Sequence, residues 1–328
     1  ETASKEGLIL LSGTTSVTAF ASLAIYDAQT LSLTADIAGS FTLEVLKGTL
    51  MAMDERLMAV RPHPDQINTA ANIRAILKDS PMLERYRGHR VQDALSIRCM
   101  PQLHGPVKKA IKDAQATLAI ELNSSVDNPL IFDEEDGGAV ALMGCNADGT
   151  YAGMASDNLC IAITDLCKMS NSRIDRLLNS LVSELPAFLN KNADFNNGLM
   201  MIQYASAGLQ GELRILAHPA VVDNLTTCAN QEDYVNMGYN AAKKAYDSMH
   251  LAKYILAAEL ICDGQALDCY EDKRCAKGTQ AIYDLLRSKV PEMDNDMPLT
   301  PYLEAVAQQI IDRAYIRTAE ASIGELKF

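Results

Sequence analysis

Tryptophan is absent from this sequence of 328 residues, and phenylalanine occurs only 6 times. Runs in which β-branched and polar residues alternate are also rare, whereas alanine and leucine are abundant. Because alanine and leucine favour helices, the composition favours an all-α protein and argues against a β-sandwich or a β-barrel.

Positive charge is in deficit. The chain carries 29 lysine and arginine residues against 42 acidic ones, which gives a formal net charge of −13. Nucleic acids and anionic membrane surfaces require basic patches, so neither is expected as a partner. No signal peptide is visible, and no uninterrupted apolar run is long enough to span a bilayer. We therefore expect a cytoplasmic protein.

The 8 cysteines lack the spacing of a metal site, because no CxxC pair occurs. Several of them, such as Cys160, Cys167 and Cys262, lie in apolar helical surroundings, which favours reduced thiols. We expect no metal and no disulfide. The P-loop, GxGxxG, HExxH and GxSxG motifs are also absent, so the chemistry that each would indicate is not predicted.

The most informative stretch that is present begins with a polar, turn-prone segment at residues 144–150. Apolar residues then recur at steps of three and four, which predicts a helix over residues 152–182. Its first half is apolar nearly all round, as expected for the buried central rod of a bundle. The same periodicity predicts further helices over residues 15–33, 35–46, 67–77, 107–126, 198–216, 234–267, 278–290 and 301–317.

A small β-hairpin is predicted around an acidic turn, with strands at residues 130–132 and 139–142. The expected fold is thus a bundle of long central helices with a small β-hairpin. We expect one helical-bundle body over residues 1–270 and a smaller helical C-terminal cap over residues 271–328.

Three polar segments beside the helices are candidates for a site. Arg98 lies between apolar neighbours, and its guanidinium is suited to a two-point grip on a carboxylate. The alternative is an ordinary salt bridge to a neighbouring acid.

The second and third segments precede long helices. Asn146 is suited to hydrogen-bond a ligand and Asp148 to balance a cation, but both residue types also form turns and helix caps. Gln231 and Glu232 precede the helix at residues 234–267, where acids are favourable capping groups. A partly buried Glu232 would instead suit a general base.

Several ordered motifs, taken together, carry a family resemblance. The chain resembles the aromatic amino acid ammonia-lyases and aminomutases, with most likeness to their histidine-directed members. The matching segments are Gln92-Asp93, Ser96-Ile97-Arg98-Cys99, Pro101-Gln102, Ser125-Val126-Asp127-Asn128-Pro129-Leu130, Ser156-Asp157-Asn158-Leu159 and Ala229-Asn230-Gln231-Glu232-Asp233.

That resemblance implies an all-α homotetramer that eliminates ammonia from an aromatic or histidine-type α-amino acid to give an arylacrylate. It also implies an electrophile, 4-methylidene-imidazol-5-one, which forms from an internal Ala-Ser-Gly tripeptide and is not a bound cofactor. No contiguous Ala-Ser-Gly occurs in this chain. The electrophile is therefore expected from a segment absent here, so an N-terminal segment or a separate chain becomes an expected partner.

Position by position, the resemblance assigns roles to five residues. Arg98 matches the arginine that binds the substrate carboxylate, and Asn146 matches a catalytic-loop asparagine. Gln231 and Glu232 match a polar pair on the far side of the site, where Glu232 would contact the substrate's side chain or amine. Met200 matches a methionine of the histidine-directed branch.

Departures from the family pattern surround the same site. Ser12 replaces an asparagine, Leu95 replaces a tyrosine, and Ala147-Asp148 replaces a phenylalanine followed by histidine. We keep Ser12 and Asp148 as candidate substrate-binding residues.

Three hypotheses follow from these matches and departures. The chain is the C-terminal portion of a working ammonia-lyase, with catalytic Glu232 and Asn146. Alternatively, it is a relative with altered chemistry, such as an electrophile-independent lyase acting on a trimethylammonium betaine, for which Asp148 would suit the cation. The third hypothesis is a catalytically inactive scaffold or regulatory subunit.

Overall fold

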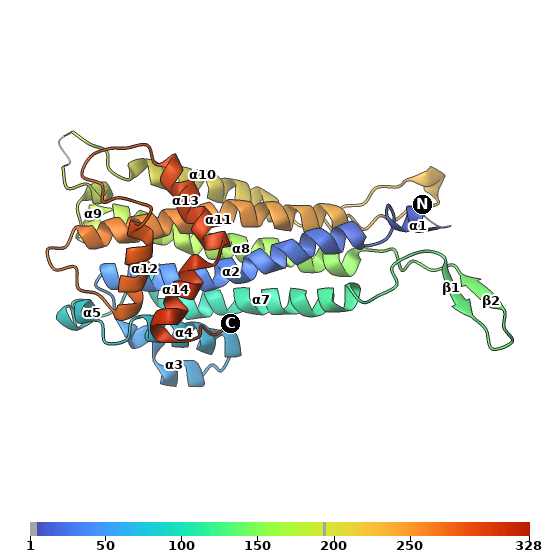
Figure 1. The fold of residues 1–328 in the computed structure, drawn as a ribbon, viewed down its shortest axis with the longest axis horizontal. Helices are drawn as coiled ribbons and strands as arrows, with labels where there is room; N and C mark the ends of the chain where they lie inside the picture. The colour runs from blue at the N-terminus through green and yellow to red at the C-terminus, as the bar shows by residue number, and fades with distance from the viewer. Residues whose placement is uncertain (1–4, 193–194) are drawn as a thin grey trace. The chain divides into compact units, whose positions relative to one another are not determined.

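The computed structural model describes residues 5–192 and 195–328, and residues 1–4 and 193–194 lie outside that part. The fold is all-α apart from one hairpin, as predicted (Figure 1). Its helices are α1 (Glu6–Ile9), α2 (Thr15–Val45), α3 (Glu55–Ala59), α4 (Pro64–Ile76), α5 (Pro81–Arg85), α6 (Leu95–Arg98), α7 (Met100–Glu121), α8 (Thr150–Leu178), α9 (Ser180–Ser183), α10 (Met200–Leu216), α11 (Gly238–Asp268), α12 (Lys277–Arg287), α13 (Thr300–Ile311) and α14 (Ala314–Ile323), and its strands are β1 (Leu130–Asp133) and β2 (Ala139–Leu142).

Backbone contacts divide the chain into two compact units. Unit 1 comprises Glu1–Tyr26, Ala110–Ile161 and Leu216–Ser248, and unit 2 comprises Asp27–Lys109, Ala162–Ile215 and Met249–Phe328. The long helices α2, α7, α8 and α11 each contribute residues to both units. The separation of a body over residues 1–270 from a cap over residues 271–328 stays a prediction.

The fully buried helical segments belong to unit 2. Residues 30–45 of α2 and 255–268 of α11 are buried at every position. Helix α8 is not covered on all sides within this chain, because Tyr151, Met154 and Ile161 are exposed in its first half. The buried part of α2 is rich in serine and threonine. Some of their hydroxyls bond within the helix, as Thr34 Oγ1 does to the Thr30 carbonyl at 2.8 Å.

The division into helices differs from the prediction in two places. Residues 15–33 and 35–46 form one helix, α2, because no glycine or proline interrupts it near Thr34. Conversely, the predicted helix at residues 301–317 is two helices, α13 and α14. They are separated at Arg313, whose left-handed φ of 58° ends the helical path.

Helix α7 begins at Met100, earlier than the predicted residue 107, and it includes Pro106 near its start. Gly105 explains why α7 and α4 can lie so close in unit 2. A Cβ on Gly105 would come within 2.7 Å of the Gln66 backbone nitrogen, so any larger residue would separate the two helices.

Within unit 2, α12 and α14 pack on each other and on α4 (Figure 1). A buried charged cluster lies nearby on α2 and α7. Asp36 accepts hydrogen bonds from His104 Nδ1 at 2.7 Å and from Lys108 Nζ at 2.6 Å, and all three side chains are fully buried. Burial raises the pKa of Asp36, but Lys108 and His104 together bring it below its usual range. Sequence periodicity did not predict this cluster.

The hairpin belongs to unit 1 and pairs in the expected antiparallel register, from Leu130 opposite Leu142 to Asp133 opposite Ala139. Across residues 5–192 and 195–328, no helix combines the length and the apolar character that crossing a membrane requires.

Candidate functional site

The predicted site residues are distributed over both units. Ser12, Asn146, Asp148, Gln231 and Glu232 belong to unit 1, whereas Arg98 and Met200 belong to unit 2. The convergence of all of them on one cleft stays a prediction, so each group is described within its own unit.

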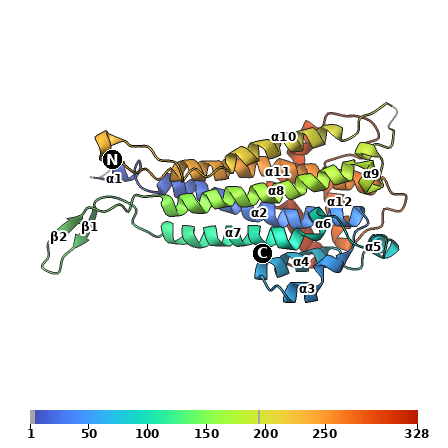
Figure 2. The same ribbon diagram turned by 180° about the vertical axis from the view of Figure 1, so that it is seen from behind.

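In unit 1, helices α2, α8 and α11 begin close together. A Cβ on Gly153 would lie 2.9 Å from Gly238 Cα, and one on Gly238 would lie 2.8 Å from the Gly149 carbonyl oxygen. Gly149 also lies next to Val17, where an added Cβ would be 3.4 Å from the valine side chain. The absence of side chains at these three glycines lets the helix starts meet backbone to backbone. The loops before these helices therefore share one end of unit 1 (Figures 1 and 2).

The loop before α8 carries two of the candidates. Residues 145–148 form a turn in which the Asp148 amide donates to the Cys145 carbonyl at 3.0 Å. Asp148 Oδ1 accepts from the Thr150 amide at 2.9 Å, so this side chain caps α8, which was the structural alternative. Asn146 is exposed, and its side chain has no hydrogen-bond partner among the described residues. Its amide is thus available to an external ligand.

The loop before α11 presents Gln231 and Glu232, both exposed. A single antiparallel bridge joins Thr227 to Glu232, and the Thr227 hydroxyl donates to Glu232 Oε2 at 2.5 Å. The intervening Cys228, Ala229 and Asn230 all have left-handed φ angles between 50° and 72°. Such strain in non-glycine residues persists only where surrounding contacts hold it, and it gathers at functional loops.

Ser12 precedes α2 and points back along its own segment, where its hydroxyl donates to the Leu8 carbonyl at 2.9 Å. The next residue, Gly13, has a left-handed φ of 84°, and a Cβ there would lie 2.2 Å from the Val126 carbonyl oxygen. Glycine is therefore required at this position, because any side chain would displace the segment after α7.

That segment links the loops of unit 1. Asp127 is buried and forms an ion pair with Lys5 at 2.6 Å. Lys5, helped by the Asn128 amide, lowers the pKa of Asp127 below its usual range. Asn128 Oδ1 in turn accepts from the Gly144 amide at 2.9 Å, which ties the segment to the loop before α8.

In unit 2, Arg98 ends the short helix α6. Its Nε is buried and lacks a hydrogen-bond partner, and its guanidinium forms no ion pair with any residue that the structure describes. The salt-bridge alternative is thus not observed among residues 5–192 and 195–328. An arginine whose buried donor is unsatisfied is a costly feature unless a ligand or another chain completes it. Met200, at the start of α10, is half-buried.

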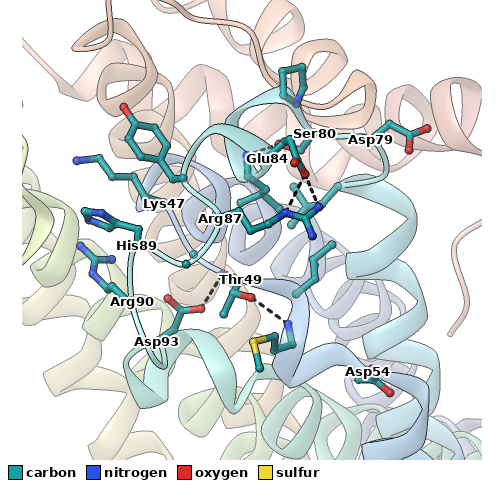
Figure 3. A pocket seen from close by; sticks show the side chains of 18 residues that line it. Lys47, Thr49, Asp54, Asp79, Ser80, Glu84, Arg87, His89, Arg90 and Asp93 are labelled. Carbon is teal, nitrogen blue, oxygen red and sulfur yellow. Dashed lines mark hydrogen bonds and ion pairs between the residues drawn. The ribbon is translucent and has the colours of Figure 1, made fainter.

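A pocket of about 910 Å³ lies in unit 2 before α6 (Figure 3). Asp93, on its wall, is buried and accepts from the Thr49 amide at 2.8 Å, and burial raises the pKa of its carboxyl. Lys47, His89 and Arg90 also line it, but they surround Glu184 and lower the pKa of that carboxyl to about 2. These three side chains therefore share the single carboxylate of Glu184. Sequence patterns did not predict this pocket.

No cluster of metal-ligating side chains occurs among the described residues. Residues 1–288 match the model of the aromatic amino acid lyase family. Histidine ammonia-lyase 2 of Fusobacterium nucleatum is 41% identical over 324 residues, covering 98% of this chain and 63% of that protein.

Two solved structures are similar in both sequence and fold. Histidine ammonia-lyase from Trypanosoma cruzi is 33% identical with a TM-score of 0.89, covering 98% of this chain and 61% of that one. Tyrosine aminomutase from Streptomyces globisporus is 28% identical with a TM-score of 0.92, covering 100% of this chain and 66% of that one. The chain thus spans less than two thirds of the length of these proteins.

Proposed function

Because this chain belongs to the aromatic amino acid lyase family, we propose that it supplies part of the active site of an ammonia-lyase. The proposed reaction removes ammonia from an α-amino acid and leaves an arylacrylate. Histidine is the first candidate substrate, since a relative that is 41% identical is a histidine ammonia-lyase. Half-buried Met200 agrees with this choice through the family resemblance.

The observation that carries this proposal is the buried Nε of Arg98, which has no hydrogen-bond partner among the described residues. A planar fork of donors that no acid of the described chain neutralises is suited to a two-point bond with an α-carboxylate. The family resemblance assigns Arg98 the same role. Arg98 would then anchor one end of the substrate.

At the other end of the substrate, the proposal uses the loops of unit 1. Glu232 is an exposed carboxylate on a strained loop, and we assign it to the substrate's amine or side chain. Asn146 offers a free amide that can donate to a group bearing developing negative charge. Gln231 contributes polar contacts beside Glu232. Asp148 is occupied as a helix cap, which leaves Asn146 as the more available residue of its loop.

The family's electrophile activates the amino acid for loss of ammonia. Since this chain has no contiguous Ala-Ser-Gly, its own residues do not fit the precursor of 4-methylidene-imidazol-5-one. We propose that this group comes from polypeptide outside these 328 residues, and that the present chain contributes substrate-binding and proton-transfer groups.

We also propose that the site is completed by homo-oligomerisation, with a tetramer as the expected state. Helix α10 carries a stripe at steps of three and four, formed by the exposed Met201, Tyr204, Gly208 and Ile215 and the half-buried Gly211. Glycines inside a helix are destabilising, and a Cβ on Gly208 or Gly211 would meet no atom of the described chain. An apolar stripe with such gaps is suited to close packing against another helix.

The test is an assay of ammonia release from histidine, phenylalanine and tyrosine by the chain reconstituted with the polypeptide that supplies the Ala-Ser-Gly segment. Ultraviolet absorbance follows the arylacrylate. Release from one amino acid supports the proposal, and an absence of release from all three refutes it. Trimethylamine release from betaines would instead support the altered-chemistry relative. An inactive scaffold would show neither product and no ligand-dependent thermal shift.

A further inference from the structure

Asp157 lies on α8 in unit 1 and is only 3% exposed. Its Oδ2 accepts hydrogen bonds from two successive backbone amides, Ala220 at 2.8 Å and Val221 at 3.0 Å. These residues begin the loop that runs from the end of α10 to the start of α11. A buried carboxylate that accepts two backbone donors is a strong attachment point, so Asp157 fastens the start of this loop to α8.

Lys244 on α11 completes the attachment. Its Nζ lies 2.8 Å from Asp157 Oδ1 and donates to the Leu216 carbonyl at 3.0 Å and to the His218 carbonyl. One ion pair therefore joins α8, α11 and the first residues of the loop. An ion pair between a buried carboxylate and a lysine that also donates to two backbone carbonyls restricts movement of all three segments.

The far end of the same loop is held separately. The Thr150 hydroxyl lies 3.2 Å from the Tyr234 hydroxyl, which ties the loop to the start of α8. Asn224 spans the loop, because its side chain donates to the Asp233 carbonyl at 3.0 Å and accepts from the Val235 amide at 2.8 Å. Residues 220–235 therefore form a loop that is fixed at both ends and has Glu232 near its tip.

From this geometry we infer that Asp157, together with Lys244, is a positioning residue that sets where Glu232 lies relative to Asn146. The loop that carries Asn146 leads directly into α8, and the loop that carries Glu232 is bonded to α8 through Asp157 and Thr150. Helix α8 therefore holds both loops. The inference rests on the proposed function for the roles of Glu232 and Asn146, whereas the fastening of the loop by Asp157 can be tested without any reaction.

The experiment compares four variants of the full chain: Asp157→Ala, Asp157→Asn, Lys244→Met and the control Lys243→Met. Asparagine keeps an oxygen acceptor for the two amides, whereas alanine removes it. Lys243 is a matched control because it pairs with Asp247 at 2.5 Å on the exposed face of the same helix and has no bond to the loop. Amide hydrogen exchange is measured over residues 216–237, and kcat and KM are measured in the reconstituted enzyme.

Asp157→Ala is expected to raise exchange at Ala220 and Val221 about tenfold or more, with a smaller rise across residues 227–235. It is also expected to lower kcat about tenfold or more while KM for the amino acid stays within about twofold, since Arg98 rather than this loop anchors the carboxylate. Asp157→Asn is expected to keep most of the wild-type protection from exchange and most of kcat. Lys244→Met is expected to lose part of both, and Lys243→Met is expected to match wild type in both.

Unchanged exchange over residues 216–237 in Asp157→Ala would overturn the inference, whatever the kinetics. So would a rise in KM with kcat retained, because that pattern indicates lost substrate binding and not a misplaced catalytic loop. If the wild-type enzyme releases no ammonia from any amino acid, the proposed function fails on its own, and the exchange data still decide whether Asp157 fixes the loop.

Discussion

Arg173 and Glu259 form an ion pair in unit 2 in which neither side chain has any exposed surface, with Arg173 Nη2 donating to Glu259 Oε2 at 3.0 Å. Arg173 Nη1 also donates to the Ser96 carbonyl at 3.3 Å, so the pair supports the short helix that ends at Arg98. A second acid, Asp263, lies beside Glu259 and receives a hydrogen bond from Thr42 at 2.7 Å.

Substitution of the two acids is expected to have unequal effects on stability. Burial and the neighbouring Glu259 raise the pKa of Asp263 well above its usual value, which favours the neutral, protonated carboxyl. Asp263→Asn preserves that neutral state and should cost less than about 1 kcal/mol. Glu259→Gln leaves the Arg173 charge uncompensated and should cost about 3–5 kcal/mol. Urea unfolding measures both, and equal losses would contradict the assignment of charge.

The same acid predicts a pH dependence. The unfolded chain releases the Asp263 proton near pH 4, whereas the raised pKa makes the folded protein release it only at higher pH. Between these two pKa values the folded state therefore binds more protons than the unfolded state. The contribution of this group to stability is complete below about pH 4 and declines as pH rises toward the folded-state pKa, by up to about 1.4 kcal/mol per pH unit.

Asp263→Asn removes that decline. The difference in unfolding free energy between wild type and Asp263→Asn should therefore shift in favour of the variant as pH increases from about 4 to 8. Denaturant titrations at several pH values measure it. A difference that is constant over this range would mean that Asp263 is not protonated in the folded state.

Helix periodicity predicted most long helices of this chain, because amphipathic spacing directly reflects which side faces a core. It predicted two helices where α2 is continuous. In the buried part of α2, the Thr34 and Ser40 hydroxyls bond to carbonyls of the same helix and therefore do not require solvent. Periodicity also could not foresee the Arg173–Glu259 pair, whose partners are 86 residues apart and meet only after α8 and α11 have packed.

The candidate site was predicted through motifs, and the local structure explains some of them. Gly13 is required by its φ and by the nearby Val126 carbonyl, and Asp157 in the Ser156–Leu159 motif fastens a distant loop. Neither reason is visible from local sequence, since both depend on contacts between segments far apart in the chain. The roles of Asn146, Gln231 and Glu232 in catalysis stay predictions.

The exposed stripe on α10 predicts an effect on assembly. Tyr204→Glu places a charge at the middle of an apolar face that is 65% exposed at this residue and is proposed to pack against another subunit. Burying an unpaired charge is costly, so the variant should dissociate to smaller species at concentrations where wild type is assembled.

Light scattering coupled to size-exclusion chromatography reports the mass directly. Glu304→Lys, an exposed change on α13, is the control and should keep the wild-type mass. A Tyr204→Glu protein with wild-type mass across the concentration range would remove α10 from the proposed subunit contact.

Arg98 supplies the last prediction, which separates function from stability. Since its guanidinium forms no ion pair within the described chain, Arg98→Met should leave the urea midpoint of the unassembled chain nearly unchanged. In the reconstituted enzyme the same change removes a charge-assisted, two-point contact with the substrate carboxylate. A contact of this type contributes about 1.5–3 kcal/mol, so kcat/KM for the amino acid should fall about 10- to 100-fold, mainly through KM.

Arg98→Lys distinguishes geometry from charge. Lysine keeps the positive charge but loses the planar fork, so it should recover only part of the lost affinity. A substrate analogue in which an amide replaces the α-carboxylate gives the complementary measurement, because wild type should discriminate strongly against it and Arg98→Met should not. If Arg98→Met lowers kcat/KM equally for the acid and the amide, the guanidinium does not bind the carboxylate, and the assignment on which the lyase proposal rests is wrong.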